Sequence, residues 1–470
     1  MNLYQQKILM GLWLFLAPML IAMSSENKNW QESYFTLQER EFQKMLLSYA
    51  NADVKEAHSI TWTVAVLRDG WGDLANLLQA VKIFKDKYPT WPIRAIIGLQ
   101  APSGNKPSDW FEQRRAKIPF DFKQFGLSEQ EILILPYEFD KHDALWIGES
   151  DDAIILQRLI DGEVLDKLAS KNTPKLREFA DFYLKSSLVI NISVFFPLSA
   201  KRFAPDIFLS EYGAPVSYFM PSYLFNKQSF FKMGLGPDCL GIFNLQPKIA
   251  DNFDNEILKK YFTKDSYNFF KYKGNLGKFW KSLISIYPEV DTMTIVANDG
   301  LGEVKKLLHI SEIKEEAKII FVDKLGKEIV LNAPEKYRHQ LIFPDVFPLS
   351  HADFLRASSM AKPPIGLTGN ASFSESLDHL PYYYQENLST EIFFDQIIKL
   401  AKHALVGADD LILFLQENQA KDSGKMGTPE SLPQIEAAWA ILVNIIRTHW
   451  DIKPRLLGLI NMRISQKARP

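Results

Sequence analysis

The chain has 470 residues, of which 47% are hydrophobic and 23% charged, a composition typical of a globular protein. This length exceeds one ordinary hydrophobic core, so two domains with additional helices are expected. Lys and Arg total 54 against 56 for Asp and Glu, and the resulting net charge of −2 argues against a nucleic-acid-binding surface over the whole molecule. Cys239 is the single cysteine, which excludes an intrachain disulfide and a cysteine-based zinc site. The 8 histidines form no HxxxH or HExxH pattern, so no metal site is predicted.

The N-terminal segment, residues 1–24, has the pattern of a signal peptide or an anchor. Lys7 precedes an uncharged, mostly apolar run from Ile8 to Met23, and Ala22-Met23-Ser24 fits a small-residue cleavage site. The run is short for a membrane span and contains Pro18, so a signal peptide is favoured over a transmembrane helix. Two alternatives stay open: an anchor that associates the protein with a membrane, and a cytosolic protein that starts at Met23.

The first half of the chain predicts a helical extension at 25–54 and an open α/β domain at 55–250. The β-branched run at 59–67 predicts a strand, apolar residues at helical spacing over 74–88 predict a helix, and 93–99 predicts a second strand. Together these three elements form a βαβ unit. Further strands are predicted at 132–135, 153–156, 188–196, 207–209 and 239–243.

The second half predicts linking helices at 251–288, where no strand pattern is visible, and a second α/β domain at 289–417. The predicted strands of this domain are 292–297, 318–322, 340–343, 364–367 and 382–384. Its predicted helices are 302–308, 352–359, 372–377 and 392–405. The remainder, 418–470, predicts a loop rich in Gly, Ser and Pro at 418–433 and a final helix at 436–448.

A turn with glycines and carboxylates follows the first predicted strand. It contains Asp69, Gly70, Gly72 and Asp73, with Asn76 one helical turn further on. The glycines permit a tight turn with close backbone approach, so both carboxylates can face a ligand at the end of the strand. Asp73 is the predicted general base and Asp69 its support, with the other three residues on the acceptor side. The alternative is local turn chemistry in which Asp73 caps the helix.

A second motif follows the predicted strand at 364–367. Thr368-Gly369-Asn370-Ala371-Ser372 leads into a predicted helix that carries Ser374 and Glu375. The free N–H groups and the positive dipole end of a helix N-terminus suit a phosphate group, so the motif predicts an anion site. The alternative is a capping arrangement, in which Asn370 or Ser372 caps the helix and Glu375 completes a capping box with Ser372.

The segment 347–384 resembles the donor-binding half of GT-B glycosyltransferases. The resemblance rests on His351-Ala352-Asp353, Ser358-Ser359, Thr368-Gly369, Glu375 and Leu380-Pro381. It implies two Rossmann-like open-sheet domains that face a cleft. It also implies a donor site in which the backbone N–H groups from Gly369 to Ser372 hold the diphosphate, helped by the hydroxyls of Thr368, Ser372 and Ser374. Glu375 would accept hydrogen bonds from ribose or sugar hydroxyls.

The turn at 69–76 is similar to that of bacterial protein-arginine rhamnosyltransferases, which are inverting GT-B enzymes. Asp69 and Asp73 match their two aspartates, and Gly72 matches the glycine between them. Asn370 stands where those enzymes carry a glutamate, so the similarity does not extend to arginine as acceptor or rhamnose as sugar.

These resemblances imply an inverting, metal-independent transfer of sugar from a nucleotide-diphosphate sugar to a protein or glycan acceptor. No cofactor is expected besides this co-substrate, and the sequence has no Asp-X-Asp triplet for metal-bound diphosphate chemistry. Two alternatives stay open: an epimerase or phosphorylase on the same fold, and a non-catalytic bacterial effector or binding protein. Donor chemistry requires a cytosol, bacterial or host, whereas the signal-like N-terminus predicts export or membrane association.

Overall fold

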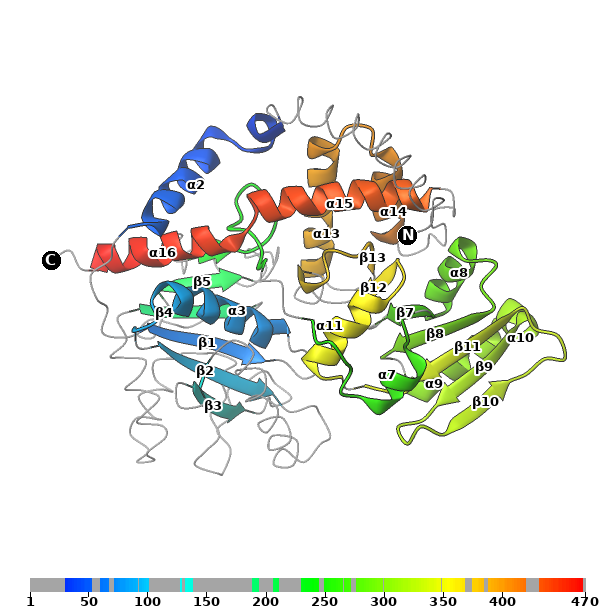
Figure 1. The fold of residues 1–470 in the computed structure, drawn as a ribbon. Coiled ribbons are helices and arrows are strands. Elements are labelled where there is room, and N and C mark those ends of the chain that lie inside the picture. Colours follow the sequence, from blue (N-terminus) through cyan, green and yellow to red (C-terminus); the bar gives the residue numbers. More distant parts are fainter. Residues whose placement is uncertain are drawn as a thin grey trace, which may run out of the picture.

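The computed structural model of the chain consists of two α/β halves and a set of helices that extends across both (Figure 1). The structure describes residues 30–52, 60–66, 72–91, 93–100, 127–128, 132–137, 188–193, 206–210, 230–244, 249–264, 266–271, 276–298, 300–347, 349–367, 374–383, 388–419 and 431–467. The predicted strand at 153–156 and the N-terminal segment 1–24 lie outside these residues. The α/β class predicted from the sequence is confirmed.

The first sheet is parallel throughout its described ladders and has the strand order β3-β2-β1-β4-β5-β6. The winding of the chain reverses between β1 and β4, as in doubly wound folds, and we call the carboxyl ends of these two strands the first switch point. Its strands are β1 (Ile60–Val66), β2 (Ile93–Gln100), β3 (Ile132–Tyr137), β4 (Leu188–Ser193), β5 (Ile207–Ser210) and β6 (Phe230–Lys232).

Helix α3 (Gly72–Lys87) packs against β1 and completes the βαβ unit predicted from the sequence. Its apolar residues recur every three or four positions and are buried, which is the pattern of a helix with one face on a sheet: Leu74, Leu77, Leu78, Val81 and Phe84. Helix α3 therefore covers β1 and begins beyond the carboxyl end of that strand.

The second sheet has the order β10-β9-β11-β8-β7-β12-β13, and β10 alone among its described strands pairs antiparallel. Its first strand in the chain, β7, lies inside the sheet, with β8 on one side and β12 on the other. The winding reverses between β7 and β12, whose carboxyl ends we call the second switch point. The strands are β7 (Tyr267–Lys271), β8 (Thr292–Ala297), β9 (Ala317–Val322), β10 (Glu328–Asn332), β11 (His339–Pro344), β12 (Ile365–Leu367) and β13 (Pro381–Tyr383).

One short helix, α7, precedes the first strand of the second sheet, and other short helices connect its strands. They are α7 (Glu256–Tyr261), α8 (Leu276–Ile286), α9 (Gly300–Lys306), the 3₁₀ helix η4 (Leu307–His309), α10 (Ser311–Glu316) and α11 (His351–Met360). Helix α11 packs on β7 through an edge-to-face contact of Phe354 with Phe270, whose ring centroids are 5.2 Å apart. The backbone N–H of Lys362, beyond the end of α11, donates to the carbonyl of Asn268 at 2.7 Å. The helix thus runs antiparallel to β7 and begins toward the carboxyl end of that strand.

Two predictions about strands are wrong. Residues 251–288 hold more than linking helices, since β7 pairs in parallel with β8 over 267–271. Its last four residues are all buried, so the strand lacks the alternation by which the sequence would show it. Residues 239–243 form only isolated bridges, because Gly241 has a φ of +117°, which interrupts an extended strand.

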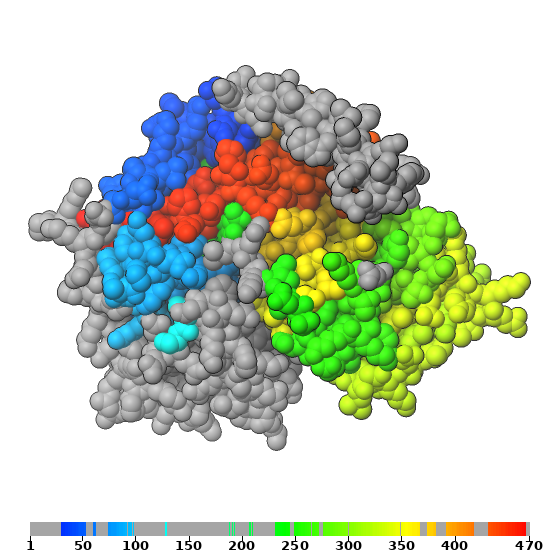
Figure 2. All heavy atoms as spheres, viewed as in Figure 1, coloured from blue at the N-terminus to red at the C-terminus, as the bar shows by residue number. Residues whose placement is uncertain are grey.

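The C-terminal helices connect the two halves. Helices α13 (Leu388–Ala404), α14 (Asp409–Gln419) and α15 (Leu432–His449) pack together, and α14 also contacts β13. Helix α16 (Ile452–Lys467) returns to the first half and packs on α2 (Leu37–Ala50) and α3. Figure 2 shows α15 and α16 as a continuous band between the surfaces of α2 and α3. The sequence predicted one helix here instead of two, and it did not predict α14.

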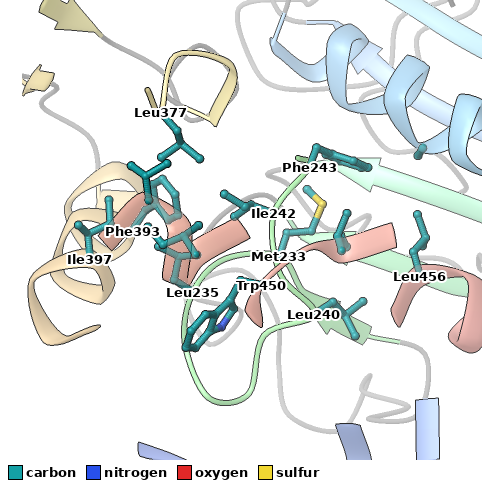
Figure 3. Close-up of a cluster of buried hydrophobic side chains, with 14 of the residues drawn as sticks. Met233, Leu235, Leu240, Ile242, Phe243, Leu377, Phe393, Ile397, Trp450 and Leu456 are labelled. Atoms are coloured by element: carbon teal, nitrogen blue, oxygen red, sulfur yellow. The ribbon is translucent and has the colours of Figure 1, made fainter. Parts of the chain in front are cut away.

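A buried loop, Met233–Phe243, lies where the two halves meet, and we call it the junction loop. Figure 3 shows its apolar side chains among those of the segment before β13, of α13, of the connection between α15 and α16, and of α16: Leu377, Phe393, Ile397, Trp450 and Leu456. Gln396 of α13 accepts a hydrogen bond from the backbone N–H of Leu235 at 2.8 Å, and Tyr34 donates to the Leu235 carbonyl at 3.1 Å. One hydrophobic core therefore extends across both halves, and a second buried cluster, which includes Phe269, Ile295 and Ile319, lies within the second half. No helix among the described residues is both long and apolar enough to cross a membrane.

Candidate functional site

The first predicted motif lies at the first switch point. Strand β1 ends at Val66 and α3 begins at Gly72, so the turn between them connects the carboxyl end of β1 to the helix. Asp69 and Gly70 lie outside the described residues. Asp73 is the second residue of α3, a first-turn position that the helix dipole favours for an acid, and it therefore lies inside the helix rather than at its cap. The roles of Asp73 and Asp69 stay predictions.

Asn76, predicted on the acceptor side, is fully buried in α3. It has an interaction partner, as a buried amide requires. Its burial indicates that it helps to hold the start of α3, and contact with an acceptor stays a prediction.

The second predicted motif follows β12 at the second switch point. Strand β12 ends at Leu367, and the residues of the predicted diphosphate loop lie outside the described part of the chain: Thr368, Gly369, Asn370 and Ser372. Ser374 and Glu375 are helical, but a turn begins at Ser376, so the helix predicted to reach residue 377 ends earlier. Contacts with distant parts of the chain explain this early end of the helix. Leu377 is buried in the core, and its carbonyl accepts a hydrogen bond from Trp439 Nε1 at 2.8 Å.

The chain after Glu375 is fixed on three sides. Ser376 Oγ lies 3.5 Å from Ser358 Oγ on α11, and Asp378 pairs with Arg447 of α15 at 2.7 Å. The carbonyl of Leu380 accepts from the N–H of Ile365 at 3.0 Å, which ties the segment to the start of β12. Glu375 therefore projects from a well-anchored backbone.

A buried lysine that sequence analysis missed lies at the second switch point. Lys271 is the last residue of β7 and is fully buried. Its partner in register on β12 is Gly366, where an added Cβ would lie 2.9 Å from Lys271 Cγ and 3.2 Å from Lys271 Cα. The glycine thus leaves room for the stem of the lysine. Lysine is almost never fully buried unless it is paired, and Lys271 has an interaction partner.

Glu375 is paired with a histidine. Its Oε1 lies 3.0 Å from Nε2 of His351, and the two side chains are 6% and 16% exposed. An ionised carboxylate only accepts hydrogen bonds, so Nε2 carries the proton of this contact. Sequence analysis placed both residues in the donor-side pattern but did not predict the pairing. The alternative in which Glu375 completes a capping box with Ser372 stays a prediction, because Ser372 lies outside the described residues.

The position of His351 is fixed by the start of α11. Ser350 caps the helix by accepting from the N–H of Asp353 at 3.1 Å, and Asp353 Oδ1 accepts from the N–H of Asp254 at 2.8 Å. Since α11 begins toward the carboxyl end of β7, His351 lies on the same side of the sheet edge as Lys271. The second switch point therefore combines a buried cation with a carboxylate–imidazole pair.

The described residues contain no group of three or more His, Cys, Asp or Glu that could hold a metal ion. What the second switch point offers instead is a positive group for an anion and a carboxylate for hydroxyl groups. The first switch point offers an acid at the start of a helix.

Comparison with known proteins gives distant structural similarities only. No family model matches the sequence, and no curated protein matches it. A protein from Listeria monocytogenes considered a UDP-N-acetylglucosamine 2-epimerase is 12% identical, over 81% of this chain and 94% of that one, with a TM-score of 0.38. UDP-GlcNAc 2-epimerase from Neisseria meningitidis, bound to UDP-GlcNAc, is 12% identical over 83% of this chain and 100% of that one, with a TM-score of 0.30. MnaA of S. aureus, in a structure with UDP, is 12% identical over 80% of this chain and 95% of that one, with a TM-score of 0.28. At these values, what those proteins bind does not identify a ligand of this chain.

Proposed function

We propose that the protein is a GT-B-type glycosyltransferase that takes a sugar from a nucleotide-diphosphate sugar at the second switch point and passes it to an acceptor at the first. The observation that carries the proposal is topological. Each motif singled out in the sequence follows the carboxyl end of a strand at which the winding of its own sheet reverses. In open α/β sheets, ligands bind at this position.

The second switch point suits the donor. Lys271 would stabilise the negative charge that grows on the diphosphate as the bond to the sugar breaks, together with backbone N–H groups of 369–372. Glu375 would accept a hydrogen bond from the ribose, and Ser374 would line the loop. The donor domain proposed from the sequence, 289–417, is better begun at β7, because Lys271 belongs to that strand.

The first switch point suits the acceptor. Asp73 would take the proton from the acceptor nucleophile as that atom attacks the anomeric carbon, and Asp69 would orient it. The new bond forms opposite the breaking bond to the diphosphate, so the configuration of the sugar inverts. The leaving diphosphate keeps the electron pair.

The test is calorimetric titration of the full chain with UDP, GDP, ADP and dTDP. We expect at least one of them to bind, and Lys271→Met to weaken its binding by about tenfold or more, since a charged hydrogen bond is lost. Because Lys271 has an interaction partner, its removal can also destabilise the protein, so urea denaturation of Lys271→Met must show a folded variant before the affinities are compared. Lys324→Met, at an exposed turn, is the matched control and should bind as the wild type does.

If none of the four nucleotides binds to the wild type, the proposal is wrong. If a nucleotide binds and Lys271→Met binds it equally well, the donor is not held at the carboxyl end of β7. Analysis of the sugar product separates the proposed transfer from epimerisation, because only transfer leaves the sugar attached to an acceptor.

A further inference from the structure

The contact between His351 and Glu375 limits how the glutamate can bind a ribose. A carboxylate that holds both hydroxyls of a vicinal diol uses both of its oxygens. Here Oε1 lies 3.0 Å from Nε2 of His351. The hydrogen bond from His351 occupies one of the two acceptor positions of Oε1 and orients the carboxylate, so Oε2 is the oxygen that we expect to accept from a ligand hydroxyl.

The orientation of this carboxylate is set from two sides. His351 is the first residue of α11, whose start is capped by Ser350 and packed on β7 through Phe354. Glu375 is two residues before Leu377, whose side chain is 1% exposed and whose carbonyl oxygen accepts a hydrogen bond from Trp439. These contacts hold the backbone at both residues, and the hydrogen bond between Nε2 and Oε1 sets the orientation of the imidazole relative to the carboxylate.

Because Glu375 is buried, the free energy of binding should depend strongly on whether a ligand hydroxyl donates a hydrogen bond to its Oε2. The side chain of Glu375 is 6% exposed, so an oxygen that loses its hydrogen-bond partner has little access to water. A site that holds a substrate hydroxyl with a buried polar group rejects an analogue without that hydroxyl, because the group is left unpaired.

We propose that His351 is a positioning residue that orients Glu375 toward a single ribose hydroxyl, so that the pair selects ribonucleotides over the corresponding deoxyribonucleotides. The inference rests on the proposed nucleotide site at the second switch point. It assigns to His351 a role in specificity, and it replaces the diol clamp expected of Glu375 with a one-hydroxyl contact.

The experiment compares the affinities of UDP, GDP and ADP with those of their 2′-deoxy and 3′-deoxy counterparts for the full chain. We expect one of the two deoxy forms to bind about tenfold or more weakly than the ribonucleotide, and the other to bind nearly as well. His351→Ala should bring the ratio of the affinity for the ribonucleotide to that for the weaker deoxy form close to one. His351→Gln should keep it, because the amide nitrogen of glutamine can donate from the place of Nε2. His309→Ala, at an exposed histidine of η4, is the control and should leave the ratio unchanged.

The outcomes separate the two proposals. If the wild type binds no nucleotide, the proposed function fails and this inference fails with it. If the wild type binds a ribonucleotide and both deoxy forms equally well, the nucleotide site stands and the inference is wrong. The inference also fails if His351→Ala weakens all forms by the same factor, since that is the effect of a structural role. If His351→Ala does not fold, Glu375→Gln serves in its place, because it keeps the size of the side chain but removes the charge. An unchanged ratio of ribonucleotide to deoxynucleotide affinity in this variant would overturn the inference.

Discussion

The indole Nε1 of Trp439 donates a hydrogen bond to the carbonyl oxygen of Leu377 at a distance of 2.8 Å. Trp439 lies on α15, and Leu377 follows Glu375 by two residues at the second switch point. Both side chains are buried in the core that the two halves share. The C-terminal helices therefore support the segment that carries Glu375, although they are remote from it in sequence.

Trp439→Phe should destabilise the protein and weaken nucleotide binding together. Phenylalanine keeps most of the aromatic contact but leaves the buried carbonyl of Leu377 without its donor, which costs about 1–3 kcal/mol. The free energy of unfolding is measured by urea denaturation, and binding by calorimetry. A variant as stable as the wild type would show that this hydrogen bond does not hold the segment.

Gly458 sets the distance between α16 and α2. A Cβ at this position would overlap the carbonyl oxygen of Leu46 and lie 2.7 Å from its carbonyl carbon. Gly458→Ala must push the two helices apart, and we expect it to lower the free energy of unfolding by about 1–3 kcal/mol or more. Gly302→Ala is the matched control, because no atom lies within 4 Å of the added Cβ, and alanine favours the helix α9 by about 0.4–1 kcal/mol. Equal effects of the two substitutions would contradict the close packing.

Asp73→Asn should lower turnover much more than donor affinity. If Asp73 is the general base, its loss reduces the turnover number by about 10²–10⁴, while a donor bound at the other sheet is held as before. The measurement is the turnover number for sugar transfer beside the calorimetric affinity for the nucleotide. Asp86→Asn, at the other end of α3, is the control, since its exposed carboxylate pairs only with Lys82 among the described contacts. Losses of turnover and affinity by the same factor would indicate a role of Asp73 in folding.

The sequence predicted those elements whose burial follows a simple pattern. Strands β1, β2 and β8 are apolar runs between turn residues, and the apolar face of α3 has helical spacing, so local pattern and tertiary structure agree. For the same reason, the positions of both motifs after strands could be derived without a structure.

The sequence could not predict β7 or the contacts of the second switch point. Strand β7 contains Asn268 and Lys271, polar residues that are fully buried because neighbouring strands and α11 cover them. A polar residue in a short segment favours a surface assignment, so only the sheet topology shows that the strand is internal. The pairing of His351 with Glu375 spans 24 residues and depends on how α11 packs, for which the sequence gives no local signal.

Acid should destabilise the protein partly through His379. Burial lowers the pKa of His379 below its ordinary value of 6.5, an effect that outweighs the nearby Asp378, which raises it. Above about pH 6.5 the histidine is neutral in both the folded and the unfolded state and does not affect stability. As the pH falls below that value, the unfolded state binds the proton first, so the free energy of unfolding decreases until the folded state is protonated as well. His449, whose pKa is lowered by burial and then by Arg455, acts in the same direction.

The measurement is urea denaturation at about pH 7.5 and about pH 5.5 for the wild type and His379→Gln. Glutamine has a similar polar side chain but does not titrate, so the variant should lose less stability between the two pH values than the wild type does. His309→Gln, at an exposed site, should keep the pH dependence of the wild type. If His379→Gln and the wild type lose the same free energy of unfolding, protonation of His379 does not contribute to acid destabilisation.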